Sequence, residues 1–147
     1  DLMLSDFLLV KELFGCGKEG RRTVLNDLGD EAAEYIRVNL EEALDRYRHV
    51  IVATHVPPYP EASLRENEDL PREQILPYYA CKAVGDVLLE MMQDRPDNKV
   101  TVFCGHTHAS ANVKKLPNLR VVTGGVKYGR PRVQQLVKVG PRNSKKA

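Results

Sequence analysis

The sequence predicts an α/β fold, a layered sandwich, and three patterns carry this prediction. Two short β-branched runs, at 50–54 and 100–104, have the composition of strands covered on both faces of a sheet. Apolar residues at helical spacing over 30–48 and over 77–94 predict one helix before the first strand and another between the two strands. Such alternation of helices and strands is typical of α/β proteins.

The first of these helices is predicted from a single apolar stripe, and Asp30 is its expected N-cap. Pro77 suits the first position of the second helix, which carries Gly85 at a cost of about 1 kcal/mol relative to alanine. An earlier segment, 4–14, has near-helical spacing until Gly15 breaks it. The stripe of the first helix consists of Ala33, Ile36, Leu40, Leu44 and Tyr47.

Further strands are expected toward the C-terminus. Residues 111–116 and 119–123 suit a hairpin across Pro117-Asn118, and 133–139 suits an outer strand with its valines on one face. The polar, proline-bearing stretch 59–72 predicts an irregular loop.

The overall composition bounds the class of protein. The chain has 147 residues, of which 42% are apolar, so one domain with a real core is expected. We assign 1–140 to that domain and 141–147 to a basic flexible tail. A net charge of only +2 offers no electrostatic case for nucleic acid or a membrane as the main partner.

Cysteine usage bears on the cellular compartment. The three cysteines lie far apart and form no CxxC pair, so a disulfide framework is not expected. The sequence also has no long apolar run or signal-peptide pattern. We therefore expect a cytoplasmic protein.

Three of the four histidines directly follow predicted strands. His55 follows the first strand, and His106 and His108 follow the second. Ligands usually bind beyond the carboxyl ends of strands in open α/β sheets, and imidazole is a good ligand for divalent transition metals. We therefore predict that these three residues bind metal, with Gly105 supplying a positive φ or a close backbone approach. His49, at the end of the first helix, is assigned a structural role.

Cys104 precedes Gly105-His106, so a structural zinc site with cysteine and histidine ligands is an alternative. Such sites usually use four ligands with closely spaced cysteine pairs, and no second cysteine lies near Cys104. A buried thiol is the preferred interpretation.

A strand ending in Thr-His-Val-Pro-Pro at 54–58 and another ending in Gly-His-Thr-His at 105–108 resemble two blocks of the calcineurin-like metallophosphoesterases. That resemblance implies a four-layer αββα sandwich and a site with two divalent ions of Mn, Fe or Zn. It also implies that His55 and His106 bind one ion and His108 the other. The substrate would be a phosphate ester, hydrolysed by metal-activated water.

The resemblance covers only the C-terminal half of the family domain. The upstream Asp-Xaa-His, Gly-Asp-Xaa-Xaa-Asp and Gly-Asn-His-Glu blocks do not occur in this sequence. We therefore expect a chain that is inactive alone, binds one metal ion or none, and needs a missing N-terminal half or another chain. Half a sandwich exposes a sheet face, through which we expect a homodimer. The alternative is a non-catalytic metal-binding or protein-interaction scaffold of the same fold.

Overall fold

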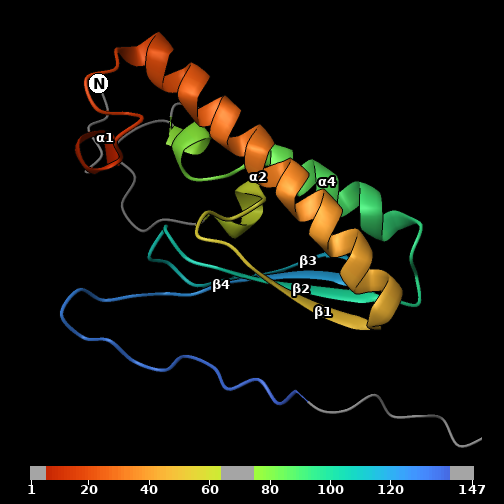
Figure 1. The fold of residues 1–147 in the computed structure, drawn as a ribbon. Coiled ribbons are helices and arrows are strands. Elements are labelled where there is room, and N and C mark those ends of the chain that lie inside the picture. The colour runs from red at the N-terminus through yellow and green to blue at the C-terminus, as the bar shows by residue number, and fades with distance from the viewer. Residues whose placement is uncertain (1–5, 64–74, 140–147) are drawn as a thin grey trace, which may run out of the picture.

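The computed structural model describes residues 6–63 and 75–139. A four-stranded sheet lies against two helices, α2 and α4, which cover the same face (Figure 1). An α/β architecture is therefore confirmed, built here from one layer of helices and one sheet. The helical elements are α1 (Asp6–Leu9), α2 (Lys18–Arg46) and α4 (Lys82–Gln93), with 3₁₀ turns η1 (Pro60–Ala62) and η2 (Leu76–Tyr78).

The sheet has the strand order β1-β2-β4-β3. Strands β1 and β4 each pair with β2 in parallel, and β3 pairs with β4 antiparallel. The predicted hairpin across Pro117-Asn118 is confirmed as β3 and β4. The strand bounds are β1 (His49–Ala53), β2 (Lys99–Cys104), β3 (Ala111–Leu116) and β4 (Leu119–Thr123).

The core lies between the helices and one face of the sheet. Alternate strand residues such as Val102 and Val121 are fully buried there, as the two-residue period of a strand requires. Leu88 from α4 is also fully buried, and the predicted stripe of α2 contributes Leu40 and Leu44. Helix α4 is therefore an amphipathic helix held mainly by its buried face.

Helices α2 and α4 both begin at residues other than those predicted. Helix α2 runs from Lys18 through Asp30, and its N-cap is Gly17, so the prediction of a cap at Asp30 is wrong. Half of the residues from Lys18 to Gly29 are good helix formers, which offsets the cost of the glycines among them. Pro77 lies in the 3₁₀ turn η2, and the second helix begins only at Lys82. Of segment 4–14, residues 6–9 form α1 and a turn follows.

Two strand predictions are also corrected. Strand β1 is at the edge of the sheet, and its residues 49, 51 and 53 are exposed, so it is covered on one face only. Residues 131–139 form no strand and run along the side of the sheet away from the helices (Figure 1). Within 59–72, the described part contains the turn η1, and 64–72 lies outside the described residues, as does the tail 141–147.

None of the helices in the described ranges is both long and apolar enough to span a membrane.

Candidate metal centre

The carboxyl ends of the three parallel strands meet at one edge of the sheet. His55 follows β1, the loop 105–108 follows β2, and Gly124 follows β4. Backbone hydrogen bonds hold these turns together: Gly105 N donates to His55 O at 3.0 Å, and Gly124 N donates to Cys104 O at 2.8 Å. The topology therefore brings the predicted histidines to the edge where α/β proteins usually bind ligands.

His55 and His106 lie in direct contact. The distance between His55 Nε2 and His106 Nδ1 is 3.1 Å, and the two rings meet edge to face with centroids 4.9 Å apart. Two nitrogens that bind one ion at about 2.1 Å lie roughly 3.0–3.4 Å apart for bond angles of about 90–109°. The spacing of this pair therefore fits two ligands of a single divalent ion.

The other ring nitrogen of His106 faces a backbone carbonyl. His106 Nε2 lies 3.0 Å from Tyr78 O, and a carbonyl can only accept, so Nε2 carries the proton. In the neutral ring, Nδ1 then holds a lone pair and accepts the hydrogen bond from His55 Nε2, so a bound metal ion would take the place of the His55 proton. Metal-binding histidines almost always donate their other N–H in this way. The Tyr79 ring packs against His106 with centroids 5.1 Å apart and holds the ring in place.

The loop after β2 contains two residues with left-handed backbone. His106 has φ 67° and His108 has φ 65°, a region that non-glycine residues rarely occupy. Strain of this kind costs on the order of 1–3 kcal/mol per residue and clusters at functional sites. The prediction of a positive φ at Gly105 is wrong, whereas a close approach of its backbone to a ligand stays a prediction.

His108 points to a different partner. Its Nε2 lies 3.4 Å from the Tyr128 hydroxyl, and the two rings meet edge to face at 4.8 Å. Across the described ranges, no three His, Cys, Asp or Glu side chains come together as a group able to hold a metal ion. The structure therefore brings together His55 and His106 but leaves His108 apart from them.

The segment that carries His55 is anchored on α4. Tyr59 Oη donates to Gly85 O at 2.8 Å, and Cys81 N donates to Pro57 O at 2.9 Å. A Cβ on Gly85 would lie only 2.3 Å from Pro58 O, so this helix position requires glycine. The close approach of chain and helix fixes the direction in which the residues after β1 run.

The Cys104 side chain is partly buried. Its Sγ lies 3.3 Å from Thr123 Oγ1, and burial raises the pKa of the thiol although the Thr123 contact lowers it. A raised pKa disfavours the thiolate that zinc requires. Since the described residues also hold no three-ligand cluster, the geometry does not favour the zinc-module alternative.

His49 makes a contact between strands. It is the first residue of β1, and its Nε2 lies 2.9 Å from Thr101 Oγ1 on β2. The structural role is consistent with this bond. The helix-dipole explanation is wrong, because α2 ends at Arg46 and the ring bonds to a strand.

Sequence reasoning missed the partners of the histidine rings. Tyr78 acts through its backbone carbonyl, which no side-chain pattern could reveal. Tyr128 follows the Gly-Gly turn after β4, and that position beside a third strand end was the available signal. Compared with protein-family models, curated proteins and solved structures, the chain matches none.

Proposed function

We propose that this chain supplies histidine ligands to a divalent-metal centre that hydrolyses phosphate esters. The contact of 3.1 Å between His55 Nε2 and His106 Nδ1 is the observation that carries this proposal. The order of the two histidine blocks, each after one of two adjacent parallel strands, supports it. The fold we propose for the complete centre is the four-layer sandwich of the calcineurin-like metallophosphoesterases.

In this proposal His55 and His106 bind one ion of Mn, Fe or Zn, and His108 binds a second. The ions would lower the pKa of a bound water and neutralise charge on the phosphoryl group. The chain's own contribution is positional. The Tyr78 carbonyl keeps the His106 proton on Nε2, and the Tyr79 ring limits rotation of the imidazole.

The described residues supply too few ligands for such a centre. Two imidazoles leave a divalent ion short of the four ligands that zinc takes in proteins. The remaining ligands, including a bridging carboxylate, would come from an N-terminal half or another chain. We therefore propose that this chain alone turns over phosphate esters slowly or not at all, and that it works in the cytoplasm.

A second candidate function is a non-catalytic scaffold of the same fold. The observation that favours it is the separation of His108, through its Tyr128 contact, from the other two histidines. A scaffold would bind one metal ion at His55 and His106 without hydrolysing any phosphate ester.

Metal titration of the purified chain by calorimetry, with Mn²⁺ and with Zn²⁺, tests the proposed site. We expect binding of one ion, weakened at least tenfold in His106→Ala because one of two ligands is lost. His49→Ala is the matched control, since it removes a histidine outside the site. Equal binding by wild type and His106→Ala would contradict the proposed ligands.

Hydrolysis of an aryl phosphate in the same samples separates the two functions. Turnover that appears when a polypeptide carrying the missing carboxylate ligands is added would support the phosphoesterase. Metal binding without turnover in that mixture would support the scaffold.

A further inference from the structure

An open groove lies between helix α2 and the edge strand β1. It has a volume of about 650 Å³. Apolar residues of the helix line one wall, and β1 from Val50 to Ala53 lines the other. Several of the apolar helix residues are exposed, among them Leu28 and Tyr35. The apolar residues on the core-facing side of the same helix are buried. Helix α2 therefore has a second apolar surface, which the described part of the chain leaves uncovered.

The backbone of β1 is also open at this groove. Arg48 O and Thr54 N form hydrogen bonds with β2. In a parallel ladder every second residue bonds to the same neighbour, so the N–H and C=O groups of residues 49, 51 and 53 point away from β2. No strand of the described residues pairs on that side. Ile51 is 41% exposed at the centre of this edge. An apolar, unpaired edge strand is a template for another extended segment.

The same chain carries a segment with matching properties. Residues 131–139 contain β-branched and apolar residues and no proline besides Pro131, yet they pair with no strand of the described residues. Leu136 is 89% exposed and Val139 is 76% exposed. We name residues 131–139 the donor segment, and the groove with the β1 edge the acceptor.

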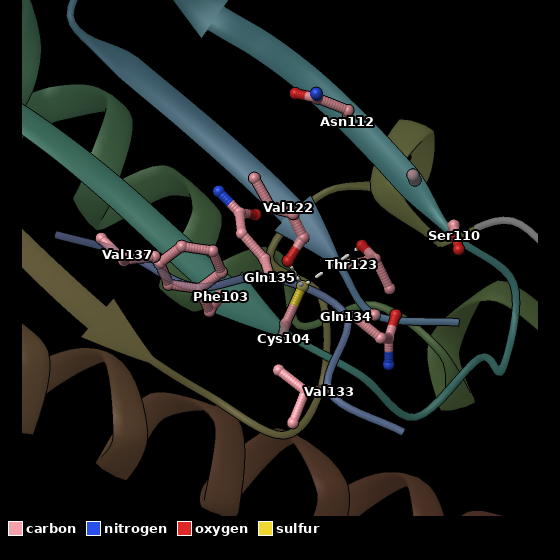
Figure 2. A pocket seen from close by; sticks show the side chains of 12 residues that line it. Phe103, Cys104, Ser110, Asn112, Val122, Thr123, Val133, Gln134, Gln135 and Val137 are labelled. Atoms are coloured by element: carbon pink, nitrogen blue, oxygen red, sulfur yellow. Dashed lines mark hydrogen bonds between the residues drawn. The ribbon is translucent and has the colours of Figure 1, made fainter. Parts of the chain in front are cut away.

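The donor segment is loosely seated on its own chain. An open cavity of about 700 Å³ is lined by Phe103 and Val122 of the sheet and by Val133 and Val137 of the segment (Figure 2). One hydrogen bond, from Gly125 N to Gln134 Oε1 at 2.8 Å, ties its beginning to the turn after β4. A segment above such a cavity loses few contacts when it moves to another surface.

Charge favours the pairing of donor and acceptor. From Gly124 onward the sequence contains no Asp or Glu, and the donor segment itself carries Arg132 and Lys138. The charged residue that lines the groove is Glu31, with Asp27 one turn before it and Glu34 one turn after it on the same helix surface. A basic segment beside this row of acids gains attraction and meets no like charge in the groove lining.

We propose that the donor segment of one copy docks as an added strand in the acceptor of a second copy. The partner is thus another molecule of this chain, and the contact joins two different surfaces. A reciprocal exchange closes a dimer, whereas a one-way contact extends into a chain of molecules. This placement differs from a homodimer formed through the exposed sheet face.

Sedimentation equilibrium over a range of concentrations tests the docking. We expect the wild-type chain to associate. Ile51→Lys places a charge on the open edge, and Leu136→Asp places an acid in the donor, so each variant should weaken association at least tenfold. Both side chains are exposed, so the variants should keep the wild-type circular dichroism. Phe14→Lys is the matched control, since it changes an exposed apolar residue outside both surfaces.

Mixing the two variants distinguishes this docking from other dimers. The Ile51→Lys copy keeps an intact donor, and the Leu136→Asp copy keeps an intact acceptor. We expect the mixture to recover association that neither variant shows alone. A wild-type chain that stays monomeric at every concentration would overturn the proposal. So would a mixture that associates no better than its parts, because β1–β1 or face-to-face dimers predict that result.

Discussion

Gly85 occupies a helix position where the chain before it passes too close for any side chain. Because a Cβ would lie 2.3 Å from Pro58 O and 2.9 Å from the Tyr59 ring, the segment after His55 depends on this glycine. From the sequence alone, Gly85 was expected to destabilise the helix. The close contact with Pro58 and Tyr59 explains why glycine occurs there.

We predict that Gly85→Ala lowers the free energy of unfolding by about 1–3 kcal/mol, since the added methyl forces the helix and the Pro58 segment apart. Gly20→Ala is the matched control in α2. A Cβ there meets Cys16 Cβ at an ordinary 3.5 Å, so the change should stabilise by about 0.5–1 kcal/mol. Urea unfolding measures both. Equal effects of the two substitutions would contradict the close approach at Gly85.

Tyr59 supplies a prediction about pH. Burial, followed by the charges of Asp86 and Glu61, raises the pKa of its phenol above the usual value of about 10. The folded state favours the neutral phenol. The stabilisation that Tyr59 provides is therefore fully present below about pH 10 and decreases above it, where the phenol ionises in the unfolded chain. The bond to Gly85 O also requires the proton.

Tyr59→Phe should therefore cost about 1–2 kcal/mol near neutral pH, because Gly85 O loses its partner. The variant should also lose less stability than wild type between about pH 9 and 11. Urea unfolding at several pH values checks both effects. A wild-type curve that falls no more steeply than the curve of the variant would contradict this account of the phenol.

His55, His106 and His108 could be predicted as site residues from the sequence because they follow strands. Their positions after two apolar runs place them where adjacent parallel strands end, and the structure brings His55 and His106 into contact there. The left-handed backbone of His106 and His108 was not predictable, because glycine was the residue expected to adopt it. Nor was the role of the Tyr78 carbonyl, which depends on a turn distant in sequence.

Helix α4 fixes the positions of the elements around the candidate site. Its buried face meets α2 and the sheet, and its N-terminal end anchors the chain after β1. Leu88 is fully buried in this face. We predict that Leu88→Ala lowers the free energy of unfolding by about 2–5 kcal/mol. The variant buries less apolar surface and leaves a cavity in the core.

Leu28→Ala is the matched control on α2, where the side chain is 39% exposed and should cost less than 1 kcal/mol. Thermal and urea unfolding compare the two leucines. Similar losses at both positions would show that α4 is not the helix that holds the core together.

The ends of strands β2, β3 and β4 were predicted to within one residue, whereas the starts of helices α2 and α4 were not. Strands β2 and β4 follow from their apolar runs, and β3 follows as the partner of β4 across the Pro-Asn turn. Asp30 was predicted as the helix start because Asp is a favoured N-cap residue and the apolar stripe begins at Ala33, but α2 begins at Lys18. Residues 133–139 have strand composition without a strand partner, and composition cannot supply one.

The molecule as a whole combines a sheet covered on one face with an open edge and an unpaired extended segment. The helices bury one face of the sheet, whereas Ile51, Ala53 and Phe103 belong to the other face and are at most partly covered. Both proposals follow from this incompleteness. The proposed metal centre takes further ligands from elsewhere, and the proposed docking adds a strand to the open edge. An uncovered sheet face was expected from the sequence, but β1 was expected to be covered on both faces and is covered on one.

The proposed metal centre requires that His55 Nε2 and His106 Nδ1 bind the same ion. The most direct measurement is NMR of the ring nitrogens in ¹⁵N-histidine-labelled chain during titration with Zn²⁺. We expect the resonances of these two nitrogens to change together, His106 Nε2 to keep its proton on the Tyr78 carbonyl, and His49 to stay unchanged. Changes that are absent, or that appear equally at His49, would contradict the proposed metal centre.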